Sequence, residues 1–193
     1  MAPTFLQAVT VLLLTSVAHV QAETHTIRFD NQCGQGTPIL ILGGQIVSNG
    51  SEYSTSGNAL SGIAYVGECG FNGEGCSLIE FTLNNPICVG CGSSADISLI
   101  PPHAFNVPTT FSYFNGCDGQ GATCNSATCN TAFFKSDDNQ VQVGCQTDNV
   151  GLLVSFCTEG SSSASASSAT PSSNEPTIFR TPVVTPQSAT PTT

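Results

Sequence analysis

The sequence predicts an all-β sandwich held together by disulfides, and three observations support this fold class. Apolar and polar residues alternate with period two in several short segments, which is the pattern of half-buried strands. Turn-forming residues separate these segments, and no stretch of useful length has the period of a helix. Ten cysteines in 193 residues indicate five disulfides and an oxidising compartment. About eight to ten short strands of this kind are typical of two packed β layers.

The first 22 residues are predicted to be a signal peptide. The apolar run Val9–Leu14 is followed by Val20-Gln21-Ala22, which places small or branched residues at the −3 and −1 positions of a cleavage site after Ala22. The run is too short to be a permanent membrane span. We therefore expect a secreted protein, extracellular or in a cell wall, whose folded domain covers residues 23–158.

Short strands are predicted along this domain. The first begins at Thr24 and places Ile27 and Phe29 on one face. The tripeptide Asn49-Gly-Ser lies in a predicted turn and is an N-glycosylation sequon, so Asn49 is a predicted glycosylation site. Further strands are expected at residues 38–42, 46–47, 61–66, 79–83, 96–100, 111–114, 141–145 and 151–157.

The composition changes abruptly after Cys157. Residues 159–193 consist mainly of Ser, Thr, Ala and Pro and carry hardly any charge. Such a segment cannot bury a core and is suited to dense O-glycosylation. It is expected to be a disordered stalk or spacer.

The chain is strongly acidic. It contains 13 acidic residues against three Lys and Arg residues, which gives a formal net charge of −10. A surface of this charge repels the phosphates of nucleic acids and of anionic lipids. We therefore expect no nucleic-acid and no membrane partner. Neutral polysaccharides and basic proteins are the partners that this charge permits.

Two carboxylates stand out in the middle of the domain. In the segment Ser77–Asn84 the apolar residues at odd-numbered positions point one way, and Glu80 points the other way. In the next alternating segment, Ile97 and Leu99 share a face and Asp96 lies opposite. Two strands that follow each other in sequence therefore each turn a carboxylate away from their apolar side.

The order of these segments resembles that of the thaumatin-like proteins. Ile-Glu-Phe-Thr-Leu-Asn, Asp-Ile-Ser-Leu-Ile and Ala-Phe-Asn-Val-Pro-Thr-Thr-Phe-Ser follow one another at near the family's spacing. The first strand ends in Asn-x-Cys, and the closing strands end in Val-x-Cys and x-Phe-Cys, as in that family. The resemblance covers Thr24 to Cys157 and implies a thaumatin-like β-sandwich. It also implies the disulfides Cys33–Cys157, Cys69–Cys76, Cys88–Cys91, Cys117–Cys145 and Cys124–Cys129.

The resemblance is to the small type of the family, which lacks a second domain. In full-length members, the cysteines matching Cys124 and Cys129 enclose that domain, whereas here four residues separate them. The family's acidic cleft lies between the two domains and is lined by one Arg, one Glu and three Asp. Glu80 and Asp96 match the Glu and one Asp, the acid expected after Cys129 falls on Thr131, and the Arg has no counterpart. Only one wall of the cleft is therefore expected.

The resemblance and the acidic composition predict binding of cell-wall β-1,3-glucan through an open acidic face, with Glu80, Asp96 and Tyr113 as ligand-binding residues. The alternative is a weak endo-β-1,3-glucanase, because glycoside hydrolysis needs two carboxyl groups astride the bond. Glu80 would then be the acid and Asp96 the base. A third interpretation is an inhibitor or effector that binds a secreted glycoside hydrolase through rigid loops. The sequence leaves open whether the protein is an enzyme, and two solvated strand carboxylates are the plain alternative.

No cofactor and no metal is expected, and the protein is expected to be a monomer. A copper histidine brace would need His25 as the amino terminus and His103 as its partner, and both are otherwise expected to be surface residues. Cys88-Val-Gly-Cys91 resembles half of a zinc site, but a structural disulfide is favoured. The glycines between Cys69 and Cys76 are not followed by a helix pattern, which favours a small disulfide loop over a phosphate-binding loop.

Overall fold

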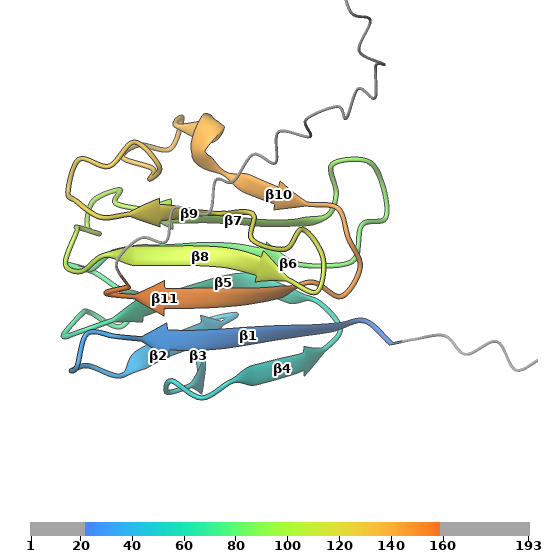
Figure 1. The fold of residues 1–193 in the computed structure, drawn as a ribbon, viewed down its shortest axis with the longest axis horizontal. Coiled ribbons are helices and arrows are strands. Elements are labelled where there is room, and N and C mark those ends of the chain that lie inside the picture. Colours follow the sequence, from blue (N-terminus) through green and yellow to red (C-terminus); the bar gives the residue numbers. More distant parts are fainter. Residues whose placement is uncertain (1–21, 159–193) are drawn as a thin grey trace, which may run out of the picture. The chain divides into compact units, whose positions relative to one another are not determined.

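The computed structural model describes residues 22–158, and these residues form eleven β-strands in two sheets (Figure 1). The predicted tail and all of the predicted signal peptide except Ala22 lie outside the described residues. The remaining regular element is a single 3-10 turn, η1 (Asn139–Val141). Within residues 22–158 no helix is long and apolar enough to cross a membrane.

The strands are short and follow the alternating segments of the sequence. In chain order they are β1 (Thr24–Asn31), β2 (Pro38–Leu42), β3 (Gln45–Ser48), β4 (Tyr53–Ser56), β5 (Ala59–Val66), β6 (Leu78–Leu83), β7 (Ser93–Ser98), β8 (Thr109–Phe114), β9 (Gly121–Cys124), β10 (Val143–Cys145) and β11 (Gly151–Phe156). The predicted all-β class is therefore confirmed for the described residues. The exposed side chain of Asn49 lies in the β3–β4 turn, as the sequon predicts.

One sheet has five strands in the order β4-β1-β11-β8-β9. Its first and last strands in sequence, β1 and β11, are neighbours and run parallel, with Ile27 opposite Leu152. The other pairs in this sheet are antiparallel. Figure 1 shows β11 in the middle of the sheet, between β1 and β8.

The second sheet has six antiparallel strands in the order β10-β7-β6-β5-β2-β3. At its centre, β6 pairs with β7 so that Glu80 lies directly opposite Asp96. On the other side of β6, Gly62 in β5 lies opposite Phe81, and a Cβ atom at Gly62 would overlap the Phe81 ring. This glycine therefore makes room for an aromatic side chain of the core.

The apolar core lies between the two sheets. It takes side chains from both, among them Ile27 and Val154 from the five-stranded sheet and Ile79 and Ile97 from the six-stranded sheet, all of them 0% exposed. Each of these residues alternates along its strand with residues that face away from the core, as period-two patterns predict. The two sheets therefore bury one face each, which is the arrangement of a β-sandwich.

All ten cysteines are paired in five disulfides. The bonds join Cys33 to Cys157, Cys69 to Cys76, Cys88 to Cys91, Cys117 to Cys145, and Cys124 to Cys129, which are the pairs that the resemblance implies. The Cys33–Cys157 bond closes the longest loop, with a sequence separation of 124 residues. Five disulfides in a domain of this size are typical of proteins from oxidising compartments.

Candidate functional site

The candidate site is centred on Glu80 and Asp96, on the outer face of the six-stranded sheet. The neighbours of these residues along β6 and β7, Ile79 and Ile97, are fully buried in the core, so the two carboxylates point to the opposite face. Because Glu80 and Asp96 are directly opposite each other, their Cβ atoms are about 4.5–5.5 Å apart. The predicted carboxylate pair is therefore brought together on one face.

The two carboxyl groups have different surroundings. Asp96 is only 8% exposed, whereas Glu80 is half-buried. Burial, followed by the negative charge of Glu80, raises the pKa of Asp96 from its ordinary value of 3.8 to about 6. Asp96 therefore holds its proton under mildly acidic conditions in which exposed aspartates are ionised.

Gln142 completes this side of the site, and the sequence analysis missed it. Its Nε2 atom donates a hydrogen bond to Asp96 Oδ2 at 3.4 Å. Val143 pairs with the core residue Ala95, so the preceding residue, Gln142, lies opposite Asp96 on the outer face. The alternation in Val141-Gln142-Val143 indicates that Gln142 faces away from the core, but only the pairing of β10 with β7 brings it to Asp96.

More polar side chains continue the site toward the β6–β7 loop. Thr82 in β6 lies directly opposite Ser94 in β7, and both are half-buried. Their positions have the same parity as Glu80 and Asp96, so their hydroxyl groups share the outer face. The polar part of this face, which we call the carboxylate face, consists of Glu80, Thr82, Ser94, Asp96 and Gln142.

An apolar cluster borders the carboxylate face on the side of β5 and β2. Ile63 in β5 is the register partner of Glu80 and is half-buried. It packs against a group formed by Ile41, Tyr65, Cys76 and Leu78, which are 2–4% exposed. The outer face of the sheet therefore changes from polar to apolar across Glu80.

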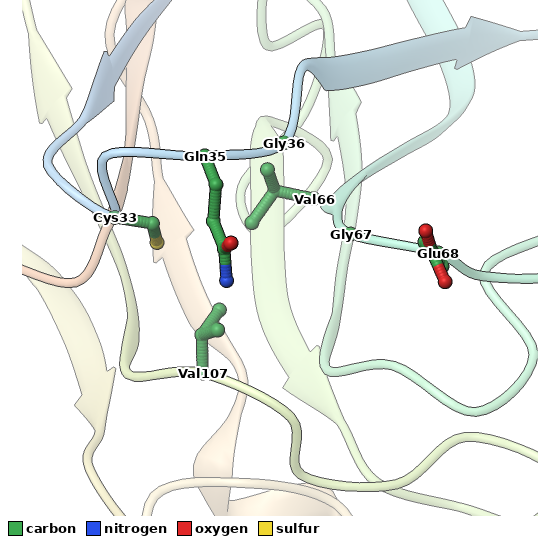
Figure 2. Close-up of a pocket in the computed structure, with 7 residues that line it drawn as sticks. All are labelled: Cys33, Gln35, Gly36, Val66, Gly67, Glu68 and Val107. Carbon is green, nitrogen blue, oxygen red and sulfur yellow. The ribbon is translucent and has the colours of Figure 1, made fainter.

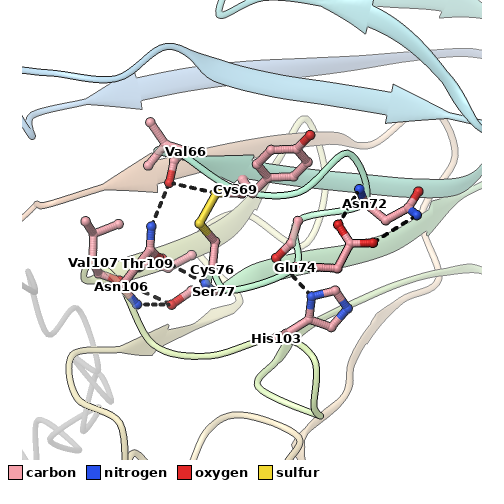
Figure 3. The surroundings of a disulfide bond; sticks show 12 residues. Val66, Cys69, Asn72, Glu74, Cys76, Ser77, His103, Asn106, Val107 and Thr109 are labelled. Atoms are coloured by element: carbon pink, nitrogen blue, oxygen red, sulfur yellow. Dashed lines mark hydrogen bonds between the residues drawn. A yellow bond between two sulfur atoms is a disulfide. The ribbon is translucent and has the colours of Figure 1, made fainter.

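The disulfide loop Cys69–Cys76 adjoins this apolar cluster (Figure 3). Tyr65 donates a hydrogen bond from its hydroxyl group to the carbonyl oxygen of Phe71 at 2.7 Å. Within the loop, the Glu74 carboxylate accepts hydrogen bonds from the main chain and side chain of Asn72. The loop is therefore a small structural unit with internal bonds, as the sequence predicts.

Tyr113 does not belong to the site, so its predicted role in ligand binding is wrong. Its side chain is 1% exposed and lies in the core, edge-on to Phe111 at a ring distance of 6.3 Å. Its hydroxyl group donates a hydrogen bond to the carbonyl oxygen of Val143 at 2.9 Å. Tyr113 has the same strand parity as Phe111, so both aromatic rings point inward.

Thr131, where the resemblance expects a cleft acid, serves a local structural role. Its hydroxyl group donates a hydrogen bond to the carbonyl oxygen of Thr123 at 2.5 Å. The nearby Asp138 accepts hydrogen bonds from the main-chain amides of Phe134 and Lys135. Neither residue adds a further acid to the carboxylate pair.

The two histidines of the copper hypothesis occupy separate places. His25 is 0% exposed, which corrects its prediction as a surface residue. Its Nδ1 atom lies 2.8 Å from the carbonyl oxygen of Val150, and its Nε2 atom lies 3.0 Å from Glu23 Oε1. His103 is bonded through Nδ1 to the carbonyl oxygen of Gly73. Because His25 is buried and the two rings bond to different neighbours, this arrangement does not favour a copper site shared by the two histidines. Within residues 22–158 no group of three or more His, Cys, Asp or Glu side chains could hold a metal ion.

A separate hollow lies away from the carboxylate face. It has a volume of about 580 Å³ and lies between the β1–β2 connection, the end of β5 and the segment before β8 (Figure 2). Glu68 is the only acidic residue of its lining, and neither Glu80 nor Asp96 lines it. We place the site at the carboxylate face because that is where two ionisable groups converge. The hollow is lined by Cys33, Gln35, Gly36, Val66, Gly67, Glu68 and Val107.

No model of a known protein family matches the sequence, and no curated protein matches it.

Proposed function

We propose that this protein is a small, secreted thaumatin-like protein that binds cell-wall β-glucan through its carboxylate face. The observation that carries this proposal is the direct opposition of Glu80 and Asp96 on the outer face of a sheet. The cross-strand disulfides and the β-sandwich arrangement support the family assignment, since they agree with what the resemblance implies. The five disulfides support secretion, because such bonds persist in oxidising compartments.

The chemistry of the carboxylate face suits a neutral sugar polymer. Carboxylates accept hydrogen bonds from sugar hydroxyl groups, while Thr82, Ser94 and Gln142 offer both donors and acceptors. Ile63, on the adjoining strand, offers apolar surface to the C–H groups of a sugar ring. The Cys124–Cys129 bond closes a loop of only a few residues, at the position where the resemblance implies a second domain in full-length members.

The direct test is recovery of the protein on insoluble β-1,3-glucan. The wild type is compared with the double variant Glu80→Gln/Asp96→Asn. A matched control, Glu52→Gln/Asp148→Asn, removes the same charge from two exposed positions. We expect the site variant to bind roughly tenfold more weakly or worse, a loss of about 1.4 kcal/mol or more, because two charge-assisted acceptors are removed.

The control is expected to bind as the wild type does. Equal recovery of all three proteins would remove the site assignment, and failure to recover the wild type would remove the proposed ligand. A loss in the control as large as in the site variant would show that net charge, rather than this face, governs binding.

Hydrolysis of the glucan is the second candidate, and the raised pKa of Asp96 favours it. A carboxylic acid whose pKa is raised to about 6 by burial, with a second carboxyl group directly opposite it, is a combination that glycosidases use. In this second candidate function we propose roles opposite to those expected from the sequence, with Asp96 as the proton donor, because its pKa is raised, and Glu80 as the base or nucleophile. Release of reducing ends from soluble β-1,3-glucan separates the two functions. A hydrolase loses this activity in both Asp96→Asn and Glu80→Gln, whereas a pure binding protein releases none.

A further inference from the structure

The loop between β6 and β7 exposes two aliphatic side chains almost completely. Ile87 is 92% exposed and Val89 is 103% exposed, whereas the next most exposed large apolar residue of the described part, Phe71, is 55% exposed. These two side chains therefore contribute little to the core. Because the fold does not bury them, almost the whole surface of both side chains is available to a partner.

The same loop is fixed in one conformation by several bonds. The Cys88–Cys91 disulfide closes it at its tip. Gln146 Oε1 accepts hydrogen bonds from the main-chain amides of Gly90 at 3.0 Å and Gly92 at 3.2 Å. Asn84 donates from Nδ2 to the carbonyl oxygen of Cys91 at 2.6 Å. A loop held in this way loses little conformational entropy when a partner binds it.

Further bonds anchor the loop to its neighbours. The main-chain amide of Asn85 donates a hydrogen bond to Glu23 Oε1 at 2.6 Å. The Oδ1 atom of Asn85 accepts a hydrogen bond from the main-chain amide of Asn149, also at 2.6 Å. Asn149 Oδ1 in turn accepts from the main-chain amide of Thr24 at 2.9 Å. The β6–β7 loop, the β10–β11 loop and the start of β1 are therefore held together as one rigid surface.

The charged side chains of three segments at this surface, residues 84–92, 115–120 and 146–149, are the two acids Asp118 and Asp148. Asp148 is exposed in the β10–β11 loop, beside the segment that bonds the apolar tip. Asp118 is exposed in the β8–β9 loop, which the Cys117–Cys145 disulfide ties to the start of the β10–β11 loop. The segments 84–92, 115–120 and 146–149 contain no Lys or Arg. A partner that approaches this end of the domain therefore gains from positive charge.

We propose that Ile87 and Val89 form a docking knob for a basic protein whose surface offers an apolar pocket bordered by Lys or Arg. A rigid aliphatic knob fits a pocket, and the acids beside it favour cationic residues around that pocket. Anionic lipid and a second copy of this chain would both bring negative charge toward Asp118 and Asp148. The knob lies in the loop that joins the two strands of the carboxylate face, but neither Ile87 nor Val89 belongs to that face, so this proposal goes beyond glucan binding.

The probe for this proposal is a displayed library of small folded domains with randomised surfaces, selected against the complete folded protein. We expect the selected domains to be rich in apolar residues and in Lys and Arg. Their affinity for the variant Ile87→Ser/Val89→Ser should fall roughly tenfold or more, since hot-spot residues dominate such interfaces. The matched control is Ile46→Ser/Leu60→Ser, which removes two aliphatic side chains that are each 49% exposed. The control should retain full affinity.

Several results would overturn the proposal. Selected domains that bind the knob variant as tightly as the wild type would show that the knob is not the preferred site. Domains without basic residues, or with affinity unaffected by Asp118→Asn/Asp148→Asn, would refute the charge argument. A third result would be that no selected domain depends on Ile87 and Val89. In that case, binding to phosphatidylcholine vesicles that the knob variant loses would assign the surface to a membrane. Dimers in sedimentation that the knob variant loses would assign it to self-association. The knob variant should still be recovered on β-glucan, so failure of this proposal and failure of glucan binding are distinguishable.

Discussion

Replacing Asp96 by asparagine is expected to stabilise the protein near neutral pH and to remove part of its pH dependence. Asp96 has a pKa of about 6 in the folded protein, against an ordinary value of 3.8 that applies when the chain is unfolded. Between these two values the folded state binds more protons than the unfolded state. The free energy of unfolding therefore falls as the pH rises through this window.

The size of the effect follows from the two pKa values. A difference of roughly two pKa units corresponds to about 3 kcal/mol, which is the cost of ionising Asp96 in its buried position beside Glu80. The cost is absent below the unfolded pKa and is fully present above about pH 6. The asparagine side chain of the Asp96→Asn variant carries no charge, keeps one oxygen as an acceptor and avoids this cost at every pH.

The assay is urea unfolding of the wild type and of Asp96→Asn, with the free energy extrapolated to water at about pH 4 and at about pH 7.5. The two proteins should be nearly equally stable at the lower pH, and the variant should be more stable by up to about 3 kcal/mol at the higher pH. The comparison cancels groups common to both proteins, such as Glu23. A stability difference that is the same at both pH values would refute the reasoning.

Three further predictions concern stability. Removing the Cys33–Cys157 bond by alanine substitution is expected to cost about 4–5 kcal/mol in the chain-entropy model, the largest loss among the five disulfides, because it closes the longest loop. Unfolding by a chemical denaturant measures the loss of stability. The prediction would be contradicted if removal of any other disulfide lowered the free energy of unfolding more. Gly62→Ala should lower the stability of the folded protein by about 1–3 kcal/mol, because the new Cβ atom overlaps the Phe81 ring. The control Gly144→Ala should change the stability little, because its Cβ atom makes only an ordinary contact. Thermal unfolding of both variants and the wild type measures the difference. Glu23→Gln should lower stability at neutral pH, because a hydrogen bond from a buried histidine lowers the pKa of this carboxyl. The stability difference between Glu23→Gln and the wild type should disappear as the pH falls through the folded pKa of Glu23. A difference in urea unfolding that does not depend on pH would contradict a stabilising Glu23–His25 interaction.

The sequence was sufficient for the carboxylate pair because strand alternation alone assigns its face. Glu80 and Asp96 each lie opposite a run of apolar residues, and consecutive strands commonly pair, so their meeting on one face could be predicted. The same rule, applied strictly, also places two residues that were predicted differently. Tyr113 shares its parity with Phe111, and His25 shares its parity with Ile27, so both belong in the core.

The rest of the site depends on contacts that alternation does not reveal. Gln142 is 46 residues from Asp96 in sequence, and nothing local indicates that β10 pairs with β7 rather than with another edge. The raised pKa of Asp96 depends on how deeply its strand is covered, which is a property of the packed molecule. The nearly complete exposure of Ile87 and Val89 was equally hidden, because two aliphatic residues on either side of a disulfide-bonded cysteine are compatible with either burial or exposure.

The central place of β11 has a consequence for how the molecule is made. In the five-stranded sheet, β11 separates β1 from β8, so the pairs β1–β4 and β8–β9 cannot join into one sheet until residues 151–156 have been synthesised. The six-stranded sheet, by contrast, is complete once residue 145 has been synthesised. A nascent chain therefore carries one finished layer with an uncovered apolar side, and assembly of the whole domain must wait for the end of translation of its last strand. Shortening the chain by a few residues before Cys157 would leave a half-built molecule rather than a slightly smaller one.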